Sequence, residues 1–196
     1  RQGENREENE ARKNPEIKNR RKSRDLPDPV RSMIMKKVAK FGGSSLASAG
    51  QMKKVADIIH ADETRRFVVP SAPGKRYSDD VKVTDLLYRC YDAAAAGEDI
   101  DGRLKEIQAR YQEIIEGLEL DLNLDEEFAV MRDYFQRQAG RDYAASRGEY
   151  LNGLVMAKYL GFKFIDAAEV VLFDERGNFD AEHTNEVMRQ RLKNMD

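Results

Sequence analysis

Short apolar runs and helix-like spacings follow one another along the chain from about residue 35 onward. The runs at residues 38–41 and 67–69 predict two strands, each closed by glycine or proline. Between them, apolar residues recur three and four positions apart from Leu46 to Ile59, which predicts a helix. Strand, glycine-rich turn, helix and strand form a βαβ unit, so we expect the two strands to be parallel.

Helical patterns dominate the rest of the chain. We expect helices over residues 84–97, 104–118 and 128–135, from near 146 to Gly161, and from about 181 onward. Apolar runs at 162–165 and 170–173 predict two more strands. The expected fold class is α/β, a three-layer αβα sandwich with a mainly parallel sheet between helices.

Residues 1–32 differ in composition from everything that follows. Their only large apolar residues are Ile17, Leu26 and Val30, and three prolines interrupt them, so we expect disorder. They carry ten Lys/Arg and seven Asp/Glu, a net charge of +3, against −5 for the remainder. A basic arm for nucleic acid or a partner is one interpretation. We favour a non-native extension before a folded part at 33–196, because acidic residues interrupt the basic ones.

Charge and cysteine content narrow the class of protein further. A net charge of −2 gives no argument for binding nucleic acid or an anionic membrane. No apolar run approaches the roughly 18 residues of a membrane span, and no secretory signal is visible. Cys90 is the only cysteine, so we expect a small buried residue in a cytoplasmic protein. With two distant histidines besides, His60 and His183, we expect no protein metal site.

The glycine turn after the first strand is the first candidate site. Gly42, Gly43 and Ser44 would let backbone N–H groups approach a phosphate, although a plain tight connection explains them equally well. Neither standard nucleotide signature is present. Lys40 lies just before the glycines, and it is either a charge on an edge strand or a cation aimed at the ligand-binding end of the sheet.

Two further motifs each allow a structural and a binding interpretation. Thr84, after the loop that begins at Ser71, suits a helix N-cap or a hydroxyl that meets a ligand carboxylate. Ser146 and Glu149 have the spacing of a capping box, in which the glutamate bonds the start of its own helix. The spacing alone favours this structural role, but the same glutamate could instead bind a substrate ammonium group.

Taken together, these motifs resemble the aspartokinase family. Lys-Phe-Gly-Gly-Ser-Ser at 40–45 is similar to the opening motif of the family. Val-Pro-Ser-Ala-Pro-Gly at 69–74 and Val-Thr-Asp-Leu-Leu at 83–87 resemble its second block, and Ser-Arg-Gly-Glu-Tyr-Leu at 146–151 resembles its third. The resemblance implies the N-terminal portion of an amino-acid kinase-like fold.

The resemblance also implies an activity and a role for each motif. An aspartokinase transfers the γ-phosphate of ATP, bound with Mg²⁺, to L-aspartate at the first step of lysine, threonine and methionine biosynthesis, commonly as a homo-oligomer. Lys40 would neutralise the phosphoryl group, supported by the glycine turn, while Ser71 and Thr84 would line the aspartate pocket. Glu149 would hold the α-ammonium of the substrate, and we favour this role over the cap.

Two departures from the family qualify this expectation. The segment between Gly74 and Thr84 is longer than in many relatives, which predicts a different shape for the aspartate loop. Family members also continue into a second half of the kinase domain and regulatory ACT domains, so we expect a truncated fragment whose own activity is open. The alternatives are a non-catalytic fragment that binds a ligand or partner, and a phosphotransferase of the same fold with another acceptor.

Overall fold

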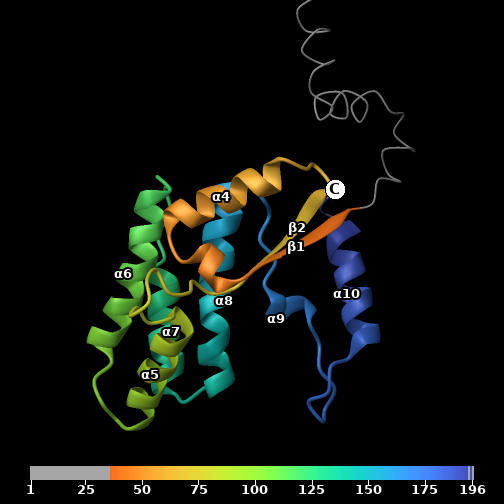
Figure 1. Cartoon of the computed structure of the whole chain (residues 1–196). Helices are drawn as coiled ribbons and strands as arrows, with labels where there is room; N and C mark the ends of the chain where they lie inside the picture. Colours follow the sequence, from red (N-terminus) through yellow and green to blue (C-terminus); the bar gives the residue numbers. More distant parts are fainter. Residues whose placement is uncertain (1–35, 194, 196) are drawn as a thin grey trace, which may run out of the picture. The chain divides into compact units, whose positions relative to one another are not determined.

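The expected βαβ unit opens the computed structural model, which describes residues 36–193 and residue 195 (Figure 1). Strands β1 (Lys37–Phe41) and β2 (Arg65–Pro70) pair in parallel and are joined by the 3-10 helix η1 (Gly43–Leu46) and helix α4 (Ala49–His60). The amide of Ser71 donates to the carbonyl of Phe41 at 3.0 Å, so the pairing continues to the carboxyl ends of both strands.

The rest of the described chain is mostly helical. Its helices are α5 (Val83–Ala95), α6 (Asp101–Gly117), α7 (Asp125–Gln136), α8 (Arg141–Leu160), α9 (Ala167–Val170) and α10 (Ala181–Lys193). Except for the start of α8, the expected helices are confirmed to within a few residues. The α/β class is confirmed as well, with a small parallel sheet among many helices. No described helix combines the length and apolar character needed to cross a bilayer.

The two later strands that we predicted, at 162–165 and 170–173, are wrong. The first run leaves α8 without pairing to another strand, and the second begins inside α9, which ends at Val170. Phe164 instead packs its ring against Tyr150 of α8, with ring centroids 5.5 Å apart. Of the second run, Val170 is buried, whereas Phe173 is 63% exposed and forms an isolated antiparallel bridge with Phe179.

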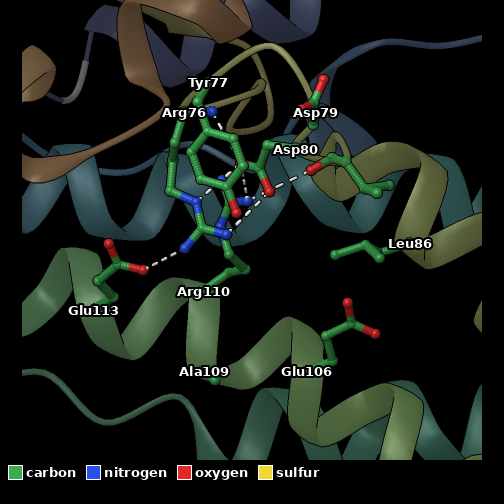
Figure 2. A pocket seen from close by; sticks show the side chains of 10 residues that line it. Arg76, Tyr77, Asp79, Asp80, Leu86, Glu106, Ala109, Arg110 and Glu113 are labelled. Atoms are coloured by element: carbon green, nitrogen blue, oxygen red, sulfur yellow. Dashed lines mark hydrogen bonds and ion pairs between the residues drawn. The ribbon is translucent and has the colours of Figure 1, made fainter.

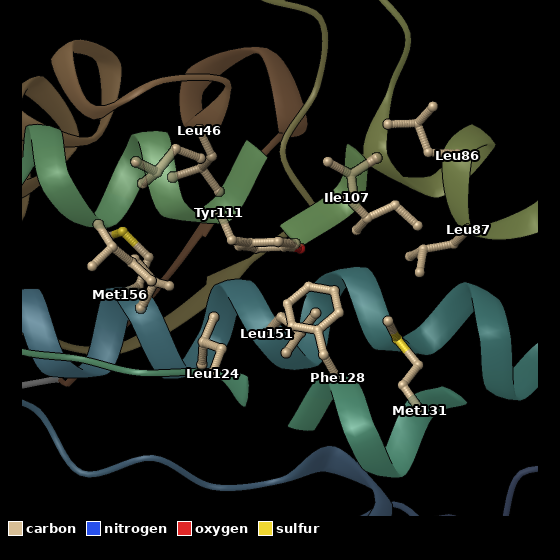
Figure 3. Packing of buried hydrophobic residues seen from close by; sticks show 14 of the residues in the cluster. Leu46, Leu86, Leu87, Ile107, Tyr111, Leu124, Phe128, Met131, Leu151 and Met156 are labelled. Carbon is tan, nitrogen blue, oxygen red and sulfur yellow. The ribbon is translucent and has the colours of Figure 1, made fainter. Parts of the chain in front are cut away.

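The core lies among helices α4 to α8, each of which contributes one apolar face (Figure 3). The closest packing is between α5 and α8 and between α5 and α6. The central side chains are Leu46, Leu87, Ile107, Tyr111, Phe128, Met131, Leu151 and Met156. Truncating one of the large aliphatic members to alanine would cost about 2–5 kcal/mol in free energy of unfolding. Cys90 is fully buried in this core, as expected, and burial raises its pKa to about 11.

The two helix caps that the sequence offered as alternatives to binding do not form. Helix α8 begins at Arg141, so Ser146 lies inside the helix, where its hydroxyl donates to the carbonyl of Tyr143 at 2.8 Å. The capping box at Ser146 and Glu149 therefore does not form. Helix α5 begins at Val83, and Thr84 is its second residue and not its N-cap. Since neither motif forms a cap, the binding interpretation remains for Thr84 and for Glu149. The disorder predicted for residues 1–32 lies outside the described residues.

Candidate active site

Lys40 lies near the carboxyl end of strand β1, just before the glycine turn. The side chain of Lys40 bends back over the turn, so that its Nζ atom lies 3.9 Å from the position that a Cβ on Gly42 would occupy. The amide of Ser45 donates to the carbonyl of Gly42 at 3.0 Å and starts helix η1. An exposed ammonium group and a glycine backbone thus share the carboxyl end of a parallel strand, where ligands bind in open α/β sheets.

The glycine turn meets the second loop backbone to backbone. The amide of Gly74 donates to the carbonyl of Gly43 at 2.8 Å. A Cβ on Gly43 would lie 2.8 Å from the carbonyl oxygen of Ala72, and a Cβ on Gly74 would lie 2.6 Å from the carbonyl carbon of Gly43. Neither position can carry a side chain without displacing main-chain atoms, so the two glycines fix the distance between the loops.

Helix α8 brings the third motif to the same loop. The carboxylate of Glu149 accepts a hydrogen bond from the amide of Ala72 at 3.3 Å, and Asn152 donates to the carbonyl of Ser71 at 2.6 Å. A Cβ on Gly148 would lie 2.6 Å from the Cβ of Ala72, so a glycine there lets the helix approach the loop closely. Glu149 is itself exposed, which leaves its carboxylate accessible to a ligand.

The second loop closes on itself just before Thr84. The amide of Val83 donates to the carbonyl of Pro73 at 3.1 Å, so the start of α5 returns to the point where the loop leaves β2. Ser71 and Thr84 therefore lie on the two sides of one closed loop. Among the described residues, no hydrogen bond or ion pair directly joins the predicted site side chains to one another; the backbone of the two loops connects them.

Three residues that the sequence reasoning missed support these loops. Asn152 contacts Ser71, and its Oδ1 atom is buried without a partner among the described residues. Its spacing of three from Glu149 places both on one helix face, a signal that the sequence did contain. Tyr111 and Arg110 of α6 bond the carbonyls of Gly148 and Gly74 at 2.8 and 3.0 Å. Their partners lie more than 30 residues away in sequence, so no local pattern marks them.

The site combines exposed charged groups with a buried tyrosine that bonds its backbone. Burial raises the pKa of Tyr111 well above its usual range, so its hydroxyl remains a hydrogen-bond donor to the backbone beside Glu149. The two charged groups of the site surface, on Lys40 and Glu149, are exposed. Over residues 36–193, the structure contains no group of three or more His, Cys, Asp or Glu side chains placed to hold a metal ion.

Known proteins have sequences and folds similar to those of this chain. The family model described as the amino acid kinase family matches residues 35–195. Aspartokinase 3 of Bacillus subtilis is 36% identical over 140 residues, which are 68% of this chain and 31% of that protein. Chloroplastic aspartokinase 1 of Arabidopsis thaliana is 32% identical over 146 residues, 70% of this chain and 25% of that protein.

A solved structure agrees with the sequence relatives. The crystal structure of aspartate kinase from Clostridium acetobutylicum superposes with a TM-score of 0.76 and 46% identity, covering 79% of this chain and 36% of that one. Aspartokinase III of E. coli, solved in complex with aspartate and ADP, gives a TM-score of 0.65 at 24% identity and supports the fold alone. The chain thus spans about a third of the length of these proteins.

Proposed function

Because the chain belongs to the amino acid kinase family, we propose that it forms the aspartate-binding side of an aspartate kinase. In the complete protein, ATP would phosphorylate the side-chain carboxylate of L-aspartate and yield 4-phospho-L-aspartate and ADP. The observation that carries this proposal is the contact between the two loops: the one with Lys40 and the glycines touches the one held by Glu149. A cation suited to phosphate and a carboxylate suited to an ammonium group are thus connected through one pair of touching loops.

The chemistry of the reaction suits this set of residues. The side-chain carboxylate of aspartate is ionised near pH 7, so it needs no general base to act as a nucleophile. Catalysis of phosphoryl transfer consists mostly of positioning and of stabilising the charge on the transferred group. Lys40 would supply positive charge, and the backbone of Gly42, Gly43 and Ser44 would let the phosphate approach. Mg²⁺ would arrive with the nucleotide, bound to its phosphate oxygens.

The substrate would be oriented by the second loop and by α8. Glu149 carries a full negative charge opposite the α-ammonium group, and this charge-assisted hydrogen bond is the strongest contact that we assign to aspartate. Ser71 and Thr84 would line the pocket around the carboxylates with hydroxyl groups. We further propose that the complete protein acts as a homo-oligomer in the cytoplasm, which light scattering and cell fractionation would test.

An acceptor screen on the complete gene product tests the function. The protein would be supplied with ATP, Mg²⁺ and one of L-aspartate, L-glutamate, a carbamate or a nucleoside monophosphate. Release of ADP would be followed, and hydroxylamine would trap any acyl phosphate. We expect turnover with L-aspartate only. Turnover with another acceptor would assign a different phosphotransferase of this fold. Binding of aspartate without turnover would assign a non-catalytic protein.

A further inference from the structure

The longer loop between Gly74 and Thr84 is held at its ends by a buried arginine. Arg110, on α6, is 5% exposed and faces the inner side of this loop. One guanidinium nitrogen donates to the carbonyl of Gly74 at 3.0 Å, and the other lies 3.4 Å from the carbonyl of Val81 and 2.7 Å from the carboxylate of Asp80. One side chain thus contacts both ends of the segment 74–81.

A second arginine completes the cluster from within the loop (Figure 2). Arg76 makes two side-chain hydrogen bonds to Asp80 at 2.9 Å, and its amide makes a third at the same distance. Its remaining nitrogen lies 2.6 Å from Glu113 of α6. The hydrogen bonds from Arg76 are the main reason that the pKa of Asp80 lies far below its usual range. We call Arg76, Asp80, Arg110 and Glu113 the loop clamp.

Residues 75–79 are exposed, so the loop clamp, and not apolar packing, fixes this part of the segment. The clamp borders a pocket of about 390 Å³ that is lined mainly by the loop and by α6. The two buried charges of the clamp, on Arg110 and Asp80, pair with each other at 2.7 Å. Replacing Asp80 would leave Arg110 as an uncompensated buried charge, whereas replacing Arg110 would leave Asp80 paired with Arg76.

The clamp is connected to the glycine turn through a single residue, Gly74. Arg110 binds the carbonyl of Gly74, while the amide of the same glycine binds the carbonyl of Gly43. The absent side chains at both glycines place these atoms in direct contact, with no soft layer to absorb a displacement. A shift of Gly74 is therefore passed on to the turn beside Lys40.

We propose that Arg110 is a positioning residue. By fixing the loop at 74–81, it sets the position of the glycine turn at residues 42–46. Its side chain is buried beneath the loop, and it acts by holding Gly74 against Gly43. Its relevance to catalysis rests on the proposed aspartate kinase function. The effect of Arg110 on the position of the turn does not depend on that function.

Hydrogen exchange on the 196-residue chain tests the mechanical part. Arg110→Met keeps an unbranched apolar stem and removes the donors, and Arg103→Met is a control on the same helix, where Arg103 is exposed and pairs with Glu98. We expect exchange in peptides covering 72–83 and 41–46 to rise about tenfold or more in Arg110→Met, with α10 unchanged and no change in Arg103→Met. Faster exchange in 72–83 alone, or in neither, would overturn the proposal.

Two further variants guard against a general loss of folding in Arg110→Met. Arg110→Lys keeps the charge and Arg110→Gln keeps an amide donor, but neither can contact both ends of the loop. If Arg110→Met does not fold, either of these should raise exchange in both peptides, and unchanged exchange at 41–46 would overturn the proposal.

Kinetics of the complete gene product then test the consequence for the reaction. In Arg110→Lys, kcat for aspartate phosphorylation should fall about tenfold or more well below the melting temperature, with a smaller change in the KM of aspartate. A lower Tm with unchanged kcat would reduce Arg110 to a stability role. A wild-type protein without turnover would instead refute the proposed function, and the exchange experiment would still decide the clamp.

Discussion

Replacing Glu149 with glutamine separates substrate binding from support of the loop. The carboxylate of Glu149 accepts one hydrogen bond, from the amide of Ala72, and the length of 3.3 Å marks a weak contact. Glutamine has the same shape and retains an oxygen that can accept this bond. Since no capping box forms at Ser146, the helix start does not depend on residue 149.

The magnitudes of the two effects differ clearly. For Glu149→Gln, the free energy of unfolding should change by less than about 1 kcal/mol, because one weak hydrogen bond is kept and the side chain is exposed. Binding of aspartate should weaken by about 1–3 kcal/mol, because a charge-assisted bond to the α-ammonium becomes a neutral one. This corresponds to about a 5- to 150-fold increase in Kd.

The measurement pairs thermal unfolding without ligand and calorimetric titration with aspartate, both on the complete gene product. Glu116→Gln is the matched control, since Glu116 is an exposed glutamate of α6 that bonds only Gln112 in the described structure. It should leave both quantities unchanged. Unchanged aspartate affinity together with lower stability in Glu149→Gln would refute the reasoning and return Glu149 to a purely structural role.

Three other changes test the remaining parts of the site. Lys40→Ala should lower kcat by about 10²-fold or more, because a charge that stabilises the transition state acts mainly on kcat. The control Lys54→Ala, at an exposed lysine of α4, should leave kcat unchanged. A higher KM for aspartate at constant kcat in Lys40→Ala would contradict this. Asn152→Ala should lower the free energy of unfolding by about 1–3 kcal/mol, since the carbonyl of Ser71 loses its buried donor, and chemical denaturation that finds no change would contradict this. The pKa of Asp80 is depressed by folding, so its contribution is complete above the unfolded pKa of about 3.9 and falls as the pH drops toward the folded value. The difference in unfolding free energy between wild type and Asp80→Asn should therefore be constant from about pH 5 to 8 and shrink below about pH 4, whereas a constant difference down to pH 2 would contradict it.

Local patterns predicted the elements that carry the site. The apolar runs and the glycine turn located β1, β2 and the loops at their ends, because strand ends and turns depend on the residues at those positions. Helix periodicity placed α4 to α7 and the end of α8 at Gly161, where a φ of 68° suits glycine. The start of α8 was missed because Ser146 and Glu149 have the spacing of a cap inside a continuing helix, and the spacing does not encode which occurs.

The residues of α6 and α8 that hold the site loops in place could not be predicted from local patterns. Asn152 and Ser71 are 81 residues apart, and Arg110 and Gly74 are 36 apart, so only the packing of α8 and α6 brings them together. The strands expected after α8 failed for a related reason. An apolar run is compatible with a strand, but pairing into a sheet requires a partner strand elsewhere in the chain, and these runs stay partly exposed.

The contact between Gly43 and Gly74 has a consequence for how the two positions tolerate mutation together. In most packed pairs, a larger residue at one site can be compensated by a smaller one at the other. Here each added Cβ would collide with main-chain atoms of the opposite loop, and neither glycine has a side chain left to shorten. The pair should therefore show no reciprocal suppression: in a two-site saturation library, every double substitution should score no better than the worse of its two single substitutions.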